Sequence, residues 1–182
     1  WLLTIIYVLF VILAAYFAAS ESAYAGLNKI RMRNLVENGD KRAKSAMYIA
    51  DRFDRALATI LVCNNVAHIG GAAISTVISV KVFKMLAERG TSVTEAAQTA
   101  IATAVTTIII CILGEMLPKR YANTNTDKFA LAFAPSMKVI MFVTFPIAIL
   151  FTGLNKLLSK ISGDVEEPTV TEEELSTIIE NV

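Results

Sequence analysis

Three long stretches of this sequence carry no charged side chain: residues 1–20, 56–80 and 96–114. A helix needs about 20 predominantly apolar residues to cross the ~30 Å hydrocarbon core of a bilayer, and each stretch is close to that length or longer. The composition agrees, because 55% of the residues are hydrophobic and the mean hydropathy is +0.57. We therefore predict an all-α membrane protein with three transmembrane helices.

A fourth apolar run, from Phe129 to Asn155, contains Lys138 and is interrupted by Pro135 and Pro146. Proline removes one hydrogen bond from the helical ladder, and its ring clashes with the preceding turn. We therefore expect a Pro-broken helix rather than a fourth crossing. This helix is either re-entrant or lies in the plane of the membrane, and the pattern leaves both forms open.

Basic residues are concentrated between Lys29 and Arg55, where eight of them accompany four acidic residues, and no Lys or Arg precedes Lys29. Cytoplasmic loops of membrane proteins carry an excess of Lys and Arg. This rule places the segment in the cytoplasm and the N-terminus outside, and three crossings then place the C-terminus in the cytoplasm. We expect a multi-pass protein of the cell membrane.

The same segment predicts two short amphipathic helices on the cytoplasmic side of the membrane, separated by Gly39 and Asp40. In the second, apolar residues recur at helical spacing, and the basic residues beside them favour an anionic membrane surface. A solvated connector is the alternative interpretation. The apolar positions are Ala46, Ile49, Ala50, Phe53 and Leu57.

The domain organisation is simple. One membrane domain covers residues 1–160, and residues 161–182 form an acidic linker in which Thr171 and Glu174 have the spacing of a capping box. Cys63 and Cys111 lie inside apolar runs, and we interpret them as packing residues without the spacing of a metal site.

Polar residues interrupt each predicted span. A charged side chain near the bilayer centre costs about 2.5–3.5 kcal/mol, so a carboxylate there usually faces a cavity, a partner or an ion. Carboxylate, amide and hydroxyl oxygens are hard ligands that suit Mg²⁺, Ca²⁺ or Na⁺. We predict a hard-cation site between the spans, with Glu115 as its first candidate. The polar positions are Ser20, Glu21 and Ser22, then Asn64, Asn65 and His68, then Gly114 and Glu115.

Helix geometry leaves two of these roles open. Ser20 and Ser22 are about 200° apart on a regular helix, so only one of them can face a given ion unless the helix is irregular. Gly114 either offers its backbone carbonyl or allows close packing of a neighbouring helix.

The second span presents a similar choice. His68 shares a face with Asn64, and we interpret it as a hydrogen-bonded packing residue rather than a ligand; Asn65 points elsewhere. Glu21, in the first span, is either a second buried carboxylate or the end of that span at the membrane surface.

Small residues recur every four positions in the first two spans. Such stripes permit close helix approach, either within one subunit or across a homodimer. They are Ala14, Ala18, Ser22 and Gly26, then Ala67, Gly71, Ser75 and Ser79.

Three segments resemble a known family. The segments 17–23, 61–68 and 114–119 read FAASESA, LVCNNVAH and GEMLPK. They are similar to the signatures of the DUF21 membrane domain of the CorB/CorC and CNNM (cyclin M) magnesium transporters. The tail from Val170 to Leu175 resembles the lead into the cytosolic CBS-domain pair of those proteins.

The resemblance implies Mg²⁺ export, Na⁺-coupled, by a homodimer with an amphipathic juxtamembrane belt. It also implies ATP binding, but only through the missing CBS region. By motif match it assigns the metal site to Ser20 or Ser22, Asn64, Gly114 and Glu115. His68 and Cys63 depart from the family pattern, which often has Asn and Gly there.

Two function classes remain from the sequence. A magnesium ion transporter with a dehydrated Mg²⁺ site between three helices is favoured, and a membrane-anchored Mg²⁺ sensor or regulator of another transporter is the alternative. An enzyme is not expected, because no Ser–His or paired-Asp constellation occurs at helical spacing. The expected partners are membrane lipid, Mg²⁺, Na⁺ and a second copy of the chain, with no nucleic acid.

Overall fold

The computed structural model describes residues 1–87 and 94–146, and these residues are helical apart from short connections. No strand occurs in the described ranges, which confirms the predicted all-α class. The third span changes from an α-helix to a π-helix partway along. In chain order the elements are α1 (Leu2–Ala25), α2 (Lys29–Glu37), α3 (Lys41–Ala50), α4 (Phe53–Ala87), α5 (Glu95–Ile109), the π-helical η1 (Ile110–Met116), α6 (Leu117–Thr124) and α7 (Thr126–Val143).

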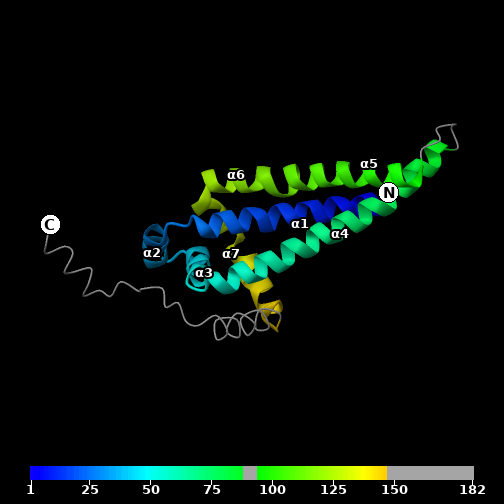
Figure 1. The fold of residues 1–182 in the computed structure, drawn as a ribbon. Coiled ribbons are helices and arrows are strands. Elements are labelled where there is room, and N and C mark those ends of the chain that lie inside the picture. Colours follow the sequence, from blue (N-terminus) through cyan, green and yellow to red (C-terminus); the bar gives the residue numbers. More distant parts are fainter. Residues whose placement is uncertain (88–93, 147–182) are drawn as a thin grey trace, which may run out of the picture. The chain divides into compact units, whose positions relative to one another are not determined.

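Three helical stretches in the described residues are long and apolar enough to cross a membrane, which confirms the predicted number of spans. They are Leu2–Ala25, Phe53–Met85 and Ala96–Thr124, and the last combines α5, η1 and α6. Helix α1 lies between α4 and the α5–η1–α6 rod and runs antiparallel to α4 (Figure 1). Helix α4 also packs against α5, so each of the three spans contacts the other two.

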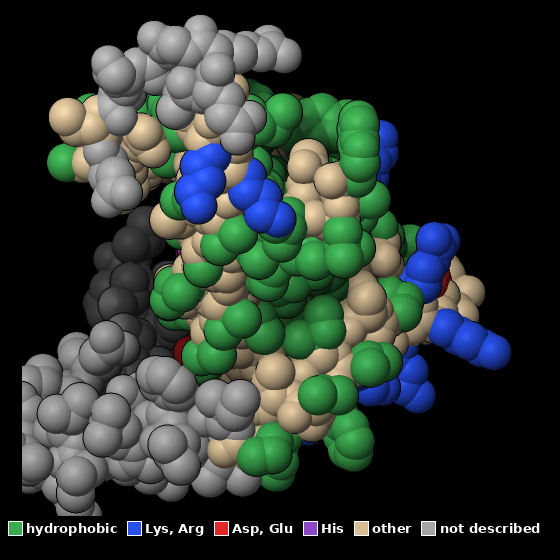
Figure 2. Space-filling view, turned by 90° about the vertical axis from the view of Figure 1, so that its right-hand side faces the viewer, with side chains coloured by type: hydrophobic (Ala, Val, Ile, Leu, Met, Phe, Trp, Pro, Cys, Tyr) green, Lys and Arg blue, Asp and Glu red, His purple; other side chains and the backbone are tan. Residues whose placement is uncertain are grey.

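The outer surface of the spans is apolar. Figure 2, which looks onto the right-hand end of Figure 1, shows hydrophobic side chains spread over much of the visible surface, with Lys and Arg side chains in separate groups. Exposed apolar surface of this extent is typical of a lipid-facing bundle. Large exposed apolar residues include Ile5, Leu9, Ile12, Ile69, Ile101 and Ile108.

Small residues set how closely the three spans approach. A methyl group added at Gly114 would lie 3.3 Å from the Cβ of Ala14, and one added at Gly71 would lie 3.3 Å from Cδ1 of Ile110. At Gly70 the added methyl would meet the Phe10 ring at 2.5 Å. These small residues therefore serve packing within one subunit, and the predicted homodimer stays a prediction.

Helices α2, α3 and α7 gather at the end of the bundle where α1 ends and α4 begins (Figure 1). Asn28 caps α2 by accepting a hydrogen bond from the Arg31 amide at 3.0 Å, and Asp40 caps α3 through the Arg42 amide at 2.7 Å. Gly39, with φ of +87°, makes the turn between them. The predicted apolar stripe of α3 is confirmed, because Ala46, Ile49 and Ala50 are buried.

Helix α7 corrects one prediction. It runs without interruption through Pro135, so this proline does not break the helix. Proline removes only one hydrogen bond, and the adjacent Ala134 and Met137 are fully buried against the core, which holds the helix together. Residues 147–155 of the predicted fourth run, and the predicted domain boundary at 160, lie outside the described residues.

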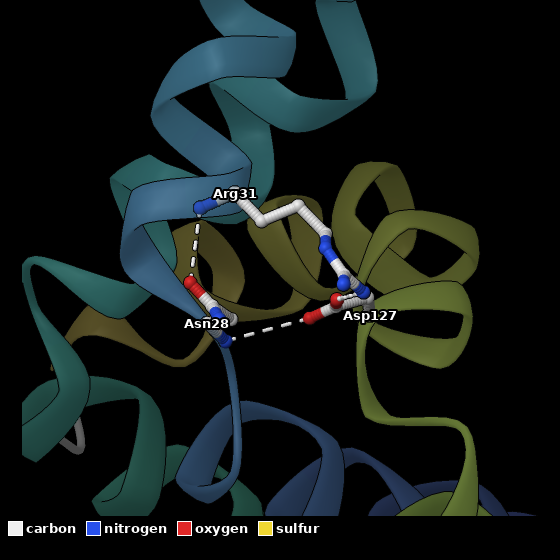
Figure 3. Close-up of polar contacts among 3 residues, drawn as sticks. All are labelled: Asn28, Arg31 and Asp127. Atoms are coloured by element: carbon white, nitrogen blue, oxygen red, sulfur yellow. Dashed lines mark hydrogen bonds and ion pairs between the residues drawn. The ribbon is translucent and has the colours of Figure 1, made fainter.

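A polar link joins the start of α7 to the α1–α2 connection (Figure 3). Asp127 accepts hydrogen bonds from Nη1 of Arg31 at 2.7 Å and from the Asn28 amide at 3.4 Å. Asp127 lies in the first turn of α7, where a negative charge also favours the helix dipole. The link ties the end of the first span to the corner that follows the third.

Candidate functional site

The π-helical segment η1 carries both Gly114 and Glu115. Single π-helical turns within α-helices occur frequently at functional sites. Within η1 the Leu117 amide donates to the carbonyl of Ile112, five residues earlier. Pro118 has no amide hydrogen, so the Gly114 carbonyl receives no α-helical hydrogen bond from that position. This carbonyl is therefore suited to an additional partner, as the prediction for Gly114 required, although Gly114 also packs closely against α1.

The Glu115 carboxylate is bound by a cation of the chain itself. Nζ of Lys119 lies 3.2 Å from Oε1 of Glu115 and 3.2 Å from Oε2 of Glu21, and all three side chains are partly buried. Helix α1 continues to Ala25, so Glu21 does not end the first span. The sequence analysis did not predict this cluster. The four-residue spacing of Glu115 and Lys119 was the available signal, whereas nothing local pointed to Glu21.

Asn64 and His68 have polar atoms that are buried without a partner. Asn64 is 8% exposed, and neither its Oδ1 nor Nε2 of His68 has a hydrogen-bond partner among the described residues. The expected hydrogen bond of a packing histidine is thus absent at that nitrogen. Asn65, one residue on, is exposed, in agreement with its predicted orientation. Buried polar atoms are normally paired, so these two indicate a role for a water molecule, an ion or a ligand.

The two serines differ in their surroundings. Ser20 is fully buried, and its hydroxyl donates to the carbonyl of Tyr16 at 2.7 Å, which leaves its oxygen lone pairs available. Ser22 is 9% exposed. Because α1 is a regular helix through both positions, the two hydroxyls point in different directions and cannot share one ion.

The positions of these groups along the axis of the bundle, called levels below, follow from the packing of α1 on α4. Phe10 contacts the position of Gly71, and the two helices are antiparallel. Asn64 precedes Gly71 by about 10 Å of helix, and Phe17 follows Phe10 by the same length. Asn64 therefore lies near the level of Phe17.

Gly114 lies near the level of Ala14, which it contacts. Along α1 the distance from Ala14 to Ser20 is about 9 Å, with Asn64 between those levels. The predicted ligands therefore lie within about two helical turns of one another along the bundle. Glu115 has the longest side chain among them.

A pocket of about 460 Å³ lies between α4 and the α5–η1 rod. Both His68 and Glu115 line it. The described residues contain no group of three or more His, Cys, Asp or Glu side chains that could hold a metal ion. A cation held here would need neutral oxygen ligands as well as Glu115. Thr76, Thr103, Thr106 and Thr107 line the same pocket.

Comparison with known proteins agrees with these features. Residues 5–182 match the family model described as CNNM, the cyclin M transmembrane N-terminal domain. A UPF0053 protein of Haemophilus influenzae is 31% identical over 180 residues, which are 97% of this chain and 40% of that protein. The UPF0053 inner membrane protein YfjD of Escherichia coli is 26% identical over 92% of this chain and 37% of its own length.

A further relative has a name that describes an activity. The polyamine export protein of Haemophilus influenzae is 24% identical over 92% of this chain and 40% of that protein. The chain thus spans about two fifths of the length of these curated relatives.

Proposed function

Since this chain belongs to the cyclin M transmembrane family, we propose that it transports Mg²⁺ as a secondary transporter, with Na⁺ entry driving Mg²⁺ export. One observation carries the proposal. A carboxylate, Glu115, lies on a π-helical segment of a span, and hydroxyl, amide and backbone oxygens of the three spans lie within about two turns of it. Discontinuous helices near the middle of the membrane are typical of ion sites in transporters.

The proposed ligands are Glu115, Asn64, the Gly114 carbonyl and one serine, Ser20 or Ser22. Ser20 is the better candidate because it is fully buried. Mg²⁺ gives up its water reluctantly, so a dehydrated site needs several oxygens and a negative charge. These groups are spread over roughly 9 Å along the bundle, and we expect the helices to draw them together when the ion binds.

Lys119 forms an ion pair with Glu115 in the described arrangement. Its ammonium group therefore competes with any incoming cation for this carboxylate. Its ammonium group acts as a tethered counter-ion that the transported ion displaces, after which Glu21 can retain it. Lys119→Met should therefore raise the Mg²⁺ affinity about three- to tenfold, because the ion no longer competes with a partly exposed ion pair. Isothermal titration calorimetry measures this.

Two control variants make the Lys119 result specific. Lys119→Arg keeps the charge and should bind Mg²⁺ as the parent does. Arg120→Met removes a neighbouring exposed charge that has no carboxylate within 4.0 Å among the described residues, and it should leave the affinity unchanged. A lower affinity in Lys119→Met would show that Lys119 positions Glu115 instead of competing for it.

The test of transport is ion flux into liposomes that contain only the purified protein. An entrapped Mg²⁺-sensitive dye should respond when Mg²⁺ is added outside. The response should be faster when the Na⁺ concentration is higher inside the liposomes, so that Na⁺ efflux drives Mg²⁺ entry. If the protein is instead a Mg²⁺ sensor, the same preparation should bind Mg²⁺ without any flux. Failure to bind Mg²⁺ at all would contradict both functions.

A polyamine is a second candidate cargo. One relative is named a polyamine export protein, and the ammonium of Lys119 between two carboxylates has the chemistry of an alkylammonium ion held by paired acids. The liposome assay distinguishes the cargoes, since uptake of labelled spermidine that Mg²⁺ does not inhibit would favour the organic cation.

The proposed orientation has the N-terminus outside and the C-terminus in the cytoplasm. In a variant without Cys63 and Cys111, single cysteines at Asn125 and Ser162 should both be protected from an impermeant thiol reagent added to intact cells. Labelling of position 162 from outside would show a fourth crossing. The control is a cysteine at Thr91, between the second and third spans, which should be labelled.

The remaining parts of the proposal concern the whole protein. The matched family describes an N-terminal domain, and the chain covers about two fifths of its relatives. We expect the segment 161–182 to lead into a cytosolic CBS-domain pair that binds ATP with Mg²⁺, and the protein to be a homodimer.

A further inference from the structure

A groove of about 230 Å³ lies where α4 begins, beside α3 and α7. It is separate from the pocket of Glu115 and shares no residue with it. Its walls combine cationic and aromatic side chains, namely Arg52, Arg55 and Lys138 with Tyr48, Phe142 and Phe145. The cations come from two places in the chain, about 80 residues apart, so only the fold brings them together.

Each cation of the groove lies over an aromatic ring. Cζ of Arg52 is 4.1 Å and Nζ of Lys138 is 5.1 Å from the centroid of the Tyr48 ring, and Cζ of Arg55 is 5.0 Å from that of Phe145. Cation–π contacts of this length hold a cation in place without neutralising its charge. The groove is therefore organised before any ligand arrives.

Among the residues that the structure describes, no acidic side chain lines the groove. Among the described residues, none of its three cations lies within 4.0 Å of a carboxylate oxygen, whereas other basic residues at this end of the bundle, such as Arg31 and Arg42, do form ion pairs. The acids nearest in sequence are Asp51 and Asp54, and Asp51 lines a neighbouring hollow instead. Within the described part of the chain, three positive charges thus converge without a counter-ion, so the complementary ligand is an anion.

The position of the groove along the second span, and the apolar residues at its rim, indicate the kind of anion. The span of α4 begins at Phe53, so Arg55 lies in its first turn, where lipid headgroups meet the hydrocarbon core. Beside the cations, Phe142, Val143 and Val139 are 83%, 69% and 62% exposed. A soluble phosphate would use only the cations, whereas a phospholipid would also cover this apolar rim.

We propose that the groove binds the phosphate headgroup of an anionic phospholipid, whose acyl chains lie against the exposed apolar face of α7. Arg52, Arg55 and Lys138 contact the headgroup oxygens. Buried Thr59, whose hydroxyl lies 3.2 Å from that of Thr144, closes the groove toward the bundle and joins α4 to α7. Lipid bound here bridges the second span and α7.

The test counts lipids that stay bound to the purified protein. The protein is exchanged into nanodiscs of phosphatidylcholine with phosphatidylglycerol, extracted gently and examined by native mass spectrometry. A triple variant, Arg52→Gln, Arg55→Gln and Lys138→Gln, should retain phosphatidylglycerol about a hundredfold less, since each of the three cations near a membrane surface contributes about 1 kcal/mol. Phosphatidylcholine retention should not change.

A matched triple controls for net charge. Lys29→Gln, Arg33→Gln and Arg120→Gln also remove two arginines and one lysine, all exposed and outside the groove. These changes should leave phosphatidylglycerol retention within about twofold of the parent. Equal losses in both triples would overturn the site and indicate a diffuse surface attraction.

Two further arms keep the test decisive. If the groove triple does not fold, Lys138→Gln and Lys138→Arg are compared, and only the neutral variant should lose lipid. Soluble glycerol phosphate at millimolar concentration should not displace phosphatidylglycerol, and complete displacement would assign the groove to a free phosphate instead. Equal retention of the anionic and zwitterionic lipids by the parent protein would reject the proposal outright.

Discussion

Glu115→Gln should keep the fold and abolish measurable Mg²⁺ binding. The substitution keeps the size of the side chain and removes the one formal charge among the proposed ligands. Losing one partner of a desolvated charge contact costs about 2–5 kcal/mol, which is about 30-fold to several thousandfold in affinity. Lys119 retains Glu21 as a partner in the variant, so the packing of α6 on α1 should survive.

The matched control for this variant is Glu21→Gln. It removes the other carboxylate bound to Lys119 and leaves Glu115 in place. Calorimetry should show a loss of affinity that is much smaller than for Glu115→Gln, and circular dichroism should show unchanged helix content for both. Unchanged Mg²⁺ affinity in Glu115→Gln, or equal losses in the two variants, would remove Glu115 from the site.

Asn64→Ala should weaken Mg²⁺ binding about tenfold or more, whereas Asn65→Ala should change it less than twofold. The two residues have identical side chains on adjacent positions of α4, so each is the control for the other. Asn64 is buried with an unpaired Oδ1, and Asn65 is exposed. The same calorimetric titration compares them. A larger loss at Asn65 would place the ion on a different face of α4, about 100° around the helix.

A gain in thermal stability for Asn64→Ala would accompany this result. Removing a buried oxygen without a partner relieves a desolvation cost of about 1–3 kcal/mol. Lower affinity together with a higher melting temperature is the pattern of a residue kept for binding. Lower affinity with a lower melting temperature would instead indicate that Asn64 supports the packing of the spans.

Several features followed from short stretches of sequence. The three spans were predictable because membrane insertion depends on apolar length, which is a sum over neighbouring residues. The caps at Asn28 and Asp40 and the buried stripe of α3 are equally local. The polar residues Asn64 and Glu115 were recognisable because their side chains are costly in an apolar helix. Their roles as ligands stay predictions.

Other features depended on contacts between distant residues. The contact of Lys119 with Glu21 arises from the packing of α6 on α1. Pro135 was expected to break its helix, but burial of Ala134 and Met137 outweighs one lost hydrogen bond. The π-helical turn at Glu115 was also not predicted, because the α and π registers share the same residues and differ only in hydrogen-bond partner.

The sequence by itself determined that this chain forms three apolar spans with a carboxylate in the third, because the cost of a polar group in lipid depends on the residue and its neighbours alone. Only the tertiary structure decided what surrounds that carboxylate. It set the pairing of Glu115 and Glu21 through Lys119 and the meeting of Arg52, Arg55 and Lys138 in one groove. Such arrangements depend on how helices far apart in the chain pack, and packing geometry is not encoded in any single segment.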